Sequence, residues 1–401
     1  MSKWPNIQEH APGGLVQTSG TEWLPSVSRL PVEFRGDAFL PDQLPGGLDS
    51  GQILQETWPD VERAVAALSS LGGLTKTLPN PYLLSDPFRL REAQASSRIE
   101  NTIASAEEVA LVGVGEESRD ESVEVWNYLN ASGLGLNGDR PVTQGLVKEM
   151  HQVLLRDGVR GSDLTPGVYR QSQAYIRGDR RGFAYARFVP PPGEHVQSSM
   201  DAYFQFIEDG PELFPAVICA AMSHYQFETI HPFSDGNGRL GRILILTQLN
   251  RAGLLARPMV DISSFFDRFR QEYCDLMLAV SLEGSWAQWI QFFCRGLVHQ
   301  AQDAEKRANQ LLELRRDFMN RVTEPRASAL LRELVDYLFT RPAVRANDVA
   351  GHLEIQHNAA QRHLNRMVEK GILQEVTGRS TRRVYVAKEI FAVIEQNFDE
   401  D

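Results

Sequence analysis

The sequence is poor in cysteine and has no long apolar run. Its 401 residues include three cysteines, Cys219, Cys274 and Cys294, which lie in apolar surroundings without a CxxC spacing. This odd number argues against a disulfide framework or a zinc site and favours small core residues. No run reaches the roughly 18 apolar residues of a membrane span, and the first ten residues lack the apolar stretch of a secretory signal. We therefore expect a cytoplasmic protein without contact to a membrane.

Positive charge is also in short supply. The chain carries 41 Lys and Arg against 52 Asp and Glu, a net of −11, which excludes an overall basic nucleic-acid-binding protein. The distribution is uneven, since residues 326–395 hold 11 Lys and Arg against 8 Asp and Glu, a net of +3. Hydrophobic residues make up 42% of the chain, an ordinary value for a globular protein, and the length suffices for two or three domains.

Reactive and anion-binding side chains are concentrated in one short stretch. It reads His231-Pro-Phe-Ser-Asp-Gly-Asn-Gly-Arg-Leu-Gly-Arg242 and lies between two apolar segments, 211–229 and 240–249, that both have the pattern of buried helices. Its glycines allow a tight turn and a close approach of the backbone to a ligand. The N–H groups that begin the second helix, flanked by Arg239 and Arg242, are typical of a phosphate site. We therefore predict that this stretch binds an anionic ligand.

Two other phosphate motifs compete for the same residues. Gly236, Gly238 and Gly241 also spell GxGxxG, but the dinucleotide-binding fingerprint requires a preceding strand, and here a helix precedes. A Walker loop would require Gly-Lys-Ser or Gly-Lys-Thr, which this stretch does not contain. A glycine-rich helix connection without chemistry would explain neither His231 nor Asp235.

The stretch resembles the signature of the Fic family, HxFx(D/E)GNGRxxR, and matches it at every defined position. The resemblance implies a mainly α fold with a Fic-type helical core. It further implies the transfer of AMP from ATP to a hydroxyl side chain of a target protein, with the chain itself as one candidate target. Relatives that phosphorylate instead resemble the signature with Lys in place of Gly238, so the glycine favours adenylyl transfer.

The same resemblance implies a role for each signature residue. His231 would act as the base, and the ordinary pKa of an imidazole, near neutrality, suits that role. Asp235 would hold Mg²⁺, for which a carboxylate is a suitable hard ligand. The other positions would bind phosphate and neutralise the departing pyrophosphate. They are Gly236, Asn237, Gly238, Arg239, Leu240, Gly241 and Arg242.

A second motif lies upstream, in the sequence Ser96-Ser-Arg-Ile-Glu100-Asn101. Ser96 and Glu100 are four residues apart and hence share one face of a helix. The motif is similar to the inhibitory motif (S/T)xxxE(G/N) of one class of Fic proteins, which implies that Glu100 pairs with Arg242 and hinders ATP binding. The same class also removes AMP from targets, so the reverse reaction stays open. The alternative interpretation is an ordinary solvated helix face.

Residues 171–189 have the pattern of a β-hairpin. The segments 171–176 and 183–189 alternate at period two around the Gly-rich sequence 177–182. In Fic-like proteins such a hairpin, the flap, holds a target segment by strand addition, which an exposed strand edge permits. The alternative is a structural hairpin that caps the helices. The family places the nucleobase near a Tyr-Tyr pair, which here reads Tyr273-Cys274, so Tyr273 is a candidate contact with core packing as its alternative.

The remaining sequence indicates four regions: an N-terminal region with the inhibitory helix (1–110), the Fic core (111–300), a helical linker (301–325) and a winged-helix domain (326–401). We expect the proline-rich residues 1–50 to form extended chain wrapped on a later core. In the C-terminal domain, helices at 330–339, 346–353 and 358–370 precede two wing strands at 372–376 and 382–386. Polar residues would line its exposed face, where DNA or a protein could bind. They are Asn358, Gln361, Arg362, Asn365, Arg366, Arg379, Arg382 and Arg383.

Two functions from different classes follow. In the first, the chain is an autoinhibited adenylyltransferase; a homodimer stays open, because Fic-like proteins often dimerise. In the second, it is a winged-helix DNA-binding regulator that uses the Fic core as a nucleotide sensor. The combination of His231, Asp235 and Arg242 favours the enzyme, since a sensor would not need the base.

Overall fold

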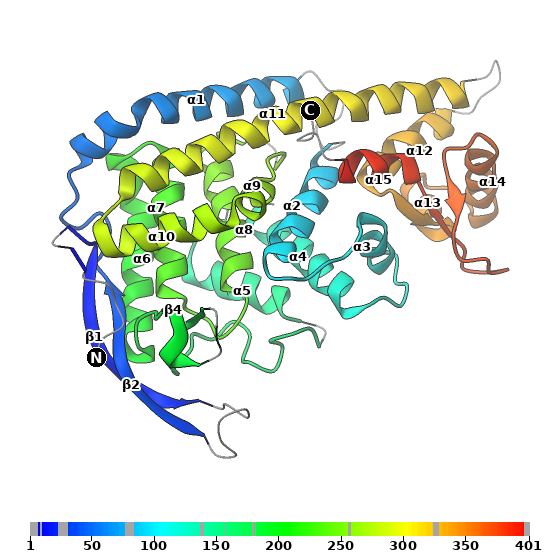
Figure 1. The fold of residues 1–401 in the computed structure, drawn as a ribbon. Helices are drawn as coiled ribbons and strands as arrows, with labels where there is room; N and C mark the ends of the chain where they lie inside the picture. The colour runs from blue at the N-terminus through cyan, green and yellow to red at the C-terminus, as the bar shows by residue number, and fades with distance from the viewer. Residues whose placement is uncertain are drawn as a thin grey trace. The chain divides into compact units, whose positions relative to one another are not determined.

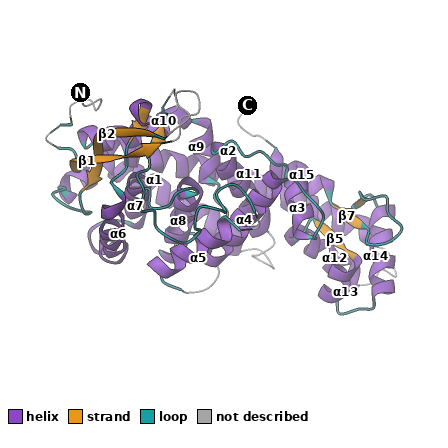
Figure 2. Cartoon of the chain, turned by 90° about the horizontal axis from the view of Figure 1, so that it is seen from below, coloured by secondary structure: helices purple, strands orange, loops and turns teal. Residues whose placement is uncertain are grey.

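The computed structural model describes residues 7–8, 10–22, 31–76, 84–136, 140–156, 158–178, 180, 182–255, 258–323 and 329–396. Helices are the main element, with one long N-terminal hairpin and otherwise short strands (Figures 1 and 2), which confirms the mainly α prediction. The chain divides into two compact units. The first comprises Met1–Ala66, Ala131–Gly253 and Arg268–Gly296, and the second comprises Ala67–Asn130, Leu254–Asp267 and Leu297–Asp401.

The first unit begins with a regular hairpin. Strands β1 (Gly13–Glu22) and β2 (Val32–Pro41) pair antiparallel over their whole length, from Gly13 opposite Pro41 to Glu22 opposite Val32. Extended chain was expected here, but its pairing into a hairpin was not predicted. Pro31 precedes β2 and Pro41 is its last residue, and strand ends tolerate proline.

Two buried helices form the centre of the first unit. Helices α7 (Ala216–Ile230) and α8 (Asn237–Arg251) pack against each other (Figure 1), and nearly every side chain of both is buried, as their apolar sequences predicted. The unit contains further helices. These are α5 (Gln144–Leu154), α6 (Gly193–Leu213), α10 (Arg270–Glu283) and the parts of α1 (Ser50–Lys76), α4 (Asp120–Leu136) and α11 (Trp286–Val322) that belong to this unit.

The predicted flap is present but short. Strands β3 (Ile176–Arg177) and β4 (Ala186–Phe188) pair antiparallel with a bulge, and the 3₁₀ turn η1 (Phe183–Tyr185) precedes β4. The alternating sequence predicted longer strands than these. Gly182 has a φ of 117°, so the backbone departs from strand geometry immediately before η1.

The second unit contains the region around the upstream motif and the C-terminal domain. Its helices include α2 (Ser85–Ile99), α3 (Ala106–Gly113) and most of α9 (Ile262–Arg268). Residues 301–322 of the expected linker form the second part of α11, which is continuous from Trp286. The C-terminal domain has the element order predicted for a winged helix, with one more strand in the sheet and one more helix at its end. Its elements are α12 (Ala329–Thr340), β5 (Ala343–Arg345), α13 (Ala346–His352), α14 (His357–Glu369), β6 (Gln374–Glu375), β7 (Val384–Val386) and α15 (Lys388–Glu395), with the strands in the order β5-β7-β6.

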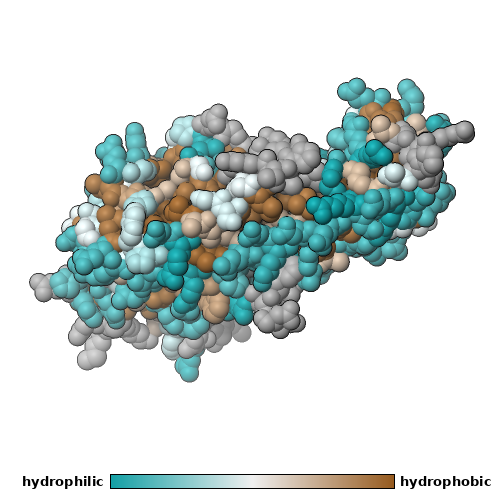
Figure 3. Space-filling view, turned by 90° about the horizontal axis from the view of Figure 1, so that it is seen from above, coloured by the Kyte–Doolittle hydropathy of each residue, from teal (hydrophilic) through white to brown (hydrophobic). Residues whose placement is uncertain are grey.

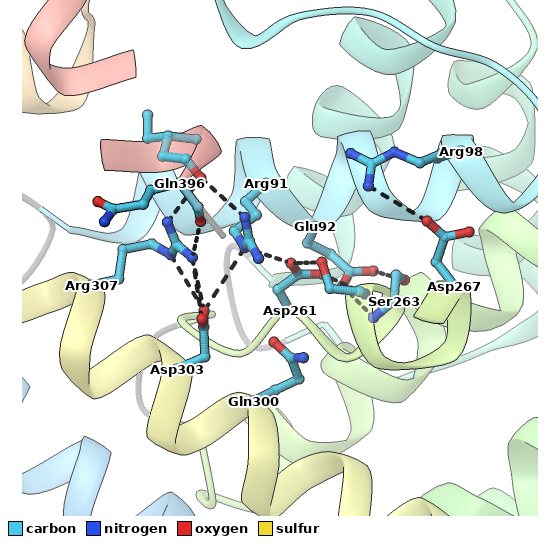
Figure 4. Close-up of polar contacts among 12 residues, drawn as sticks. Arg91, Glu92, Arg98, Asp261, Ser263, Asp267, Gln300, Asp303, Arg307 and Gln396 are labelled. Atoms are coloured by element: carbon cyan, nitrogen blue, oxygen red, sulfur yellow. Dashed lines mark hydrogen bonds and ion pairs between the residues drawn. The ribbon is translucent and has the colours of Figure 1, made fainter. Parts of the chain in front are cut away.

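A buried polar network ties α2 to α11 and α15 within the second unit (Figure 4). The guanidinium of Arg307 pairs with Asp303 at 3.1 Å and donates to the carbonyl oxygens of Ile394 (3.1 Å) and Gln396 (2.9 Å). Arg91 on α2 pairs with Asp261 at 3.0 Å and also donates to Ile394. The carbonyls at the C-terminal end of α15 therefore receive two cations, which complement the helix dipole.

On the face shown in Figure 3, hydrophilic residues surround smaller apolar areas, as is usual for protein surfaces. Within the described part of the chain, none of the helices combines the length and hydropathy that a bilayer crossing requires. All three cysteines are free thiols, and Cys219 and Cys294 are buried.

Candidate catalytic and anion-binding site

The signature stretch forms the connection between α7 and α8, where the backbone takes two left-handed turns. His231 caps the C-terminal end of α7 with φ 50° and ψ 61°, and its N–H donates to the carbonyl oxygen of Phe227 at 2.9 Å. Gly236 caps the N-terminal end of α8 with φ 76° and ψ 4°. A glycine adopts this conformation without strain, whereas a histidine pays about 1 kcal/mol or more, so the position of His231 must be enforced by its surroundings.

Arg170 holds the backbone of His231 in this conformation. Its buried guanidinium donates from Nε to the carbonyl oxygen of His231 at 2.7 Å and from Nη2 to that of Ile230 at 3.1 Å. The guanidinium also donates to the carbonyl oxygens of Ser172 and Pro191. The backbone N–H of Arg170 donates to the carbonyl oxygen of Pro232. Burial lowers the pKa of Arg170 to about 10, so the group stays charged at neutral pH. The arginine thus satisfies carbonyls that the end of α7 leaves without helical partners.

His151, on α5, supports the middle of the loop. Its ring stacks on Phe233 with 3.8 Å between centroids. Its Nδ1 accepts from the N–H of Gly167 at 2.7 Å, so the neutral ring carries its proton on Nε2 and donates to the carbonyl oxygen of Asp235 at 2.9 Å. Burial lowers the pKa of His151 to about 4, which keeps this arrangement neutral at pH 7.

Asn237 closes the loop with its side chain. Its Oδ1 accepts from the N–H of Phe233 at 2.9 Å, and its Nδ2 donates to the carbonyl oxygen of Phe233 at 2.8 Å. The amide side chain is therefore engaged within the loop, which leaves the backbone of Asn237 for the predicted anion site. The N–H groups of Asn237 and Gly238 belong to the first turn of α8, and such groups have no acceptor within a helix.

Asp235 lies at the edge of the loop, with 28% of its side chain exposed. Its Oδ1 accepts from the N–H of Gly236 at 2.6 Å and lies 3.6 Å from Nη2 of Arg239, while Oδ2 lies 3.6 Å from Nε of Arg160. No group of three or more metal-binding side chains occurs among the described residues. One accessible carboxylate nevertheless fits Mg²⁺, which commonly binds through one or two carboxylates together with substrate phosphates.

The other signature residues are buried. Arg239 and Arg242 have almost no exposed surface, and Leu240 is part of the core, so it can offer only its backbone to a ligand. Gly241 allows α8 to approach α7, because a Cβ there would lie 2.4 Å from Oε1 of Glu228. Helix packing therefore explains the glycine at position 241 independently of phosphate binding.

Tyr273 borders a cavity of about 140 Å³ beside the flap. The residue is buried, and its hydroxyl lies 2.7 Å from Nε2 of His224 on α7. Burial, with a contribution from the nearby Arg242, lowers the pKa of His224 to about 3. The cavity is lined by flap residues and by residues of α7 and α10. These are Ile176, Arg187, Phe188, Glu228, Thr229, Tyr273, Cys274, Met277, Leu278 and Ser281.

The upstream motif belongs to the second unit. Ser96 is buried within α2, and Glu100 is the C-cap residue of that helix, with φ −90° and ψ 12°. The pairing of Glu100 with Arg242 stays a prediction.

Sequence analysis missed Arg170 and His151, the two residues that hold the loop from outside. Arg170 precedes the flap and is 61 residues from His231, while His151 is 84 residues from Asp235. A histidine on the buried face of an amphipathic helix was a weak signal for His151. We find no comparable local signal for Arg170.

Three segments of the chain match known family models. Residues 58–137 match the "Fic/DOC family N-terminal" model, and residues 141–249, which include the signature, match the "Fic/DOC family" model. Residues 314–390 match the "Protein adenylyltransferase SoFic-like, C-terminal domain" model. The chain belongs to the Fic/DOC family. This confirms the family that the signature indicated.

Relatives of this Fic protein include proteins named protein adenylyltransferase Fic. The one from Aedes aegypti is 32% identical over 211 residues, which cover 48% of this chain and 36% of the relative. The one from Nematostella vectensis is 36% identical over 131 residues, which cover 32% of this chain and 27% of the relative. The chain thus spans about a third of the length of these relatives.

Solved Fic structures resemble the fold at lower sequence identity. A Fic family protein from Desulfovibrio desulfuricans aligns with a TM-score of 0.52 and 20% identity, covering 82% of this chain and 96% of its own. A Fic domain containing signaling protein from Bacteroides thetaiotaomicron aligns with a TM-score of 0.50 and 18% identity, covering 60% and 95%. At these identities the similarity concerns the fold.

Proposed function

We propose that this Fic protein is a protein adenylyltransferase, which moves AMP from ATP to a hydroxyl side chain of a target protein or of the chain itself. The observation that carries the proposal is the connection between α7 and α8. It places a histidine at one end and a glycine-capped helix N-terminus with two buried arginines at the other. The names of the Aedes and Nematostella relatives support the same activity.

In the proposed reaction the target hydroxyl oxygen attacks the α-phosphorus of ATP. His231 takes the hydroxyl proton, a P–O bond to the target forms, and the bond to pyrophosphate breaks. The N–H groups of Asn237 and Gly238 would bind phosphate oxygens, and Arg239 and Arg242 would neutralise the charge of the leaving pyrophosphate. The N–H of Gly236 would join them when Asp235, whose Oδ1 accepts from it in this structure, turns to Mg²⁺. When bound, Mg²⁺ would neutralise triphosphate charge, with Asp235 as its protein ligand.

We assign the cavity beside the flap to the nucleobase. It is bordered by Tyr273 and Cys274 of α10 and by Ile176 of the flap, and much of its lining is apolar. A mostly apolar cavity with a few polar groups is typical of small-ligand sites. The target would bind along the flap, residues 171–189, whose short strands offer an edge for an extended segment.

Glu100 is proposed to restrain the activity, because a carboxylate on Arg242 would remove a cation that the triphosphate needs. The reverse reaction, release of AMP from a modified target, stays a prediction for the same residue. The arrangement of the C-terminal domain does not add support for DNA binding. Glu116, which follows α3, pairs with Arg379 at 3.0 Å and also with Arg345. Part of the positive charge that could contact DNA is therefore already neutralised. DNA binding, a homodimer and a cytoplasmic location stay predictions.

The proposal is tested by incubating the full chain with ATP labelled at the α-phosphate and Mg²⁺. We expect Glu100→Gly to incorporate label at least tenfold faster than the wild type, and Glu100→Gly with His231→Ala to incorporate none. Equal labelling of the wild type and Glu100→Gly would contradict the restraint. Equal labelling with and without His231 would contradict the enzymatic role of the site.

A further inference from the structure

The β1–β2 hairpin lies outside the three matched family segments, since its last residue, Pro41, precedes the first matched residue, Trp58. It nevertheless contacts the flap at several points. The family match thus gives no role to a well-formed element beside the proposed target-binding segment.

An aromatic contact joins the hairpin to the tip of the flap. The rings of Phe34 on β2 and Phe183 on η1 stack with 4.2 Å between centroids and 16° between planes. Gly36 makes room for this contact, because a Cβ there would lie 2.7 Å from the ring of Phe183. Tyr175, on the other arm of the flap, meets Phe183 edge-on at 6.3 Å. The ring of Phe183 therefore contacts aromatic rings on two sides.

Hydrogen bonds join the hairpin to the tip and to one arm of the flap. Both carboxylate oxygens of Glu22 accept from the N–H of Phe183, at 3.2 and 3.0 Å. The hydroxyl of Thr18 donates to Oε1 of Gln173 at 2.6 Å, and Nε2 of Gln173 donates to the carbonyl oxygen of Pro190 at 2.8 Å. The side chain of Gln173 thus links β1 to the first arm of the flap and to Pro190, the residue that follows the flap.

A third set of contacts holds the end of the flap. The N–H of Phe39 donates to the carbonyl oxygen of Val189 at 2.9 Å, and the rings of Phe39 and Phe188 lie 5.8 Å apart. By contrast, the flap's own ladder consists of a two-residue and a three-residue strand with a bulge between its paired residues. A two-stranded hairpin is at best marginally stable by itself, so most of the order of the flap must come from its neighbours.

We propose that the β1–β2 hairpin is a brace that fixes the flap, with Phe34 and Glu22 as positioning residues for the protein target. This inference rests on the proposed function, because the flap is the proposed target-binding segment. The brace holds the arm of the flap that runs from Phe183 to Val189 at both ends. An extended target segment that adds to the flap then meets an edge whose position is already set, which lowers the entropy cost of binding. Phe34 and Glu22 contact Phe183, which does not line the proposed nucleobase cavity. Their loss should therefore change the affinity for the protein acceptor more than the affinity for ATP.

The test compares Phe34→Ala, Glu22→Gln and Leu15→Ala in the full-length Glu100→Gly chain. Leu15 is the matched control, because it lies on the same hairpin with 40% of its surface exposed. Hydrogen exchange of flap peptides is measured first. We expect about tenfold faster exchange in Phe34→Ala, and a smaller increase in Glu22→Gln, with unchanged exchange in α7 and α8. Leu15→Ala should match the parent.

Labelling provides the second measurement, with the inactive His231→Ala chain as the protein acceptor at increasing concentration. Phe34→Ala should raise the KM for this acceptor severalfold while the Kd for ATP stays within about twofold. Unchanged flap exchange in both Phe34→Ala and Glu22→Gln would overturn the brace, as would equal changes in Leu15→Ala. A changed Kd for ATP with an unchanged acceptor KM would overturn its role in target binding. If the parent incorporates no AMP, the proposed function fails, while hydrogen exchange still decides whether the hairpin fixes the flap.

Discussion

The guanidinium of Arg170 donates to the carbonyl oxygen of His231 at 2.7 Å, at the residue where α7 ends in a left-handed turn. The same guanidinium reaches the carbonyl oxygens of Ser172 and Pro191, on either side of the flap strands. One buried cation therefore fixes both the proposed base and the segment proposed to carry the target.

We predict that Arg170→Lys lowers AMP incorporation at least tenfold in the Glu100→Gly background. An ammonium group cannot reach the same set of carbonyls, and an unsatisfied buried carbonyl costs about 1–3 kcal/mol. The rate of labelling at saturating ATP measures the effect. Arg251→Lys is the control, since Arg251 also donates to two backbone carbonyls, those of Arg140 and Gly135, and lies at the far end of α8. Equal losses in both variants would contradict a specific role for Arg170.

His151 should make stability depend on pH. Its pKa in the folded protein, about 4, lies below the ordinary 6.5, so the stability contribution is present above pH 6.5 and is lost as pH falls toward 4. The difference corresponds to roughly 3 kcal/mol. The Tm of the wild type should therefore fall more than the Tm of His151→Phe as pH is lowered from 6.5 to 4. Parallel pH profiles of the two proteins would contradict the assignment.

Gly161 should be required for Asp235 to bind Mg²⁺. A Cβ at Gly161 would lie 2.8 Å from Oδ2 of Asp235, and its φ of +84° is unfavourable for other residues. Gly161→Ala should therefore displace the carboxylate and weaken Mg²⁺-dependent ATP binding. Gly158→Ala is the matched control, because Gly158 has a similar φ of +73° without any atom near the added Cβ. The Kd for ATP, measured with and without Mg²⁺, should change only in Gly161→Ala; similar changes in both would indicate backbone strain alone.

The buried carboxyl of Glu92 should give the second unit the opposite pH dependence. It accepts from the hydroxyl of Tyr128 at 2.8 Å and from the N–H of Ser263 at 3.0 Å (Figure 4 shows Glu92 beside Asp261 and Ser263). Burial and the neighbouring Asp261 raise the pKa of Glu92 well above its ordinary 4.5. Its stability contribution is therefore complete below pH 4.5 and is lost as pH rises. From pH 4.5 to 8, the Tm of the wild type should fall relative to that of Glu92→Gln. A difference in Tm that stays constant would contradict the raised pKa.

The site could be predicted from sequence where its parts are neighbours in the chain. His231 through Arg242 is contiguous, and the apolar pattern on both sides was enough to predict two buried helices. The supports of the loop could not be predicted, because Arg170 and His151 reach it only through the tertiary fold. The β1–β2 hairpin was missed for a different reason. Residues 1–50 are rich in proline, which argues against strand pairing, but Pro31 precedes β2 and Pro41 ends it, and a proline at a strand end removes no hydrogen bond from the ladder.

The central claim is that the signature loop directs the α-phosphorus of ATP toward a protein hydroxyl. It is tested most directly by incubating the Glu100→Gly chain with Mg²⁺ and ATP labelled at either the α- or the γ-phosphate, with His231→Ala as the control. We predict protein-bound label from α-labelled ATP only, and none when His231 is replaced. Label from γ-labelled ATP, or α-label that persists without His231, would contradict the account.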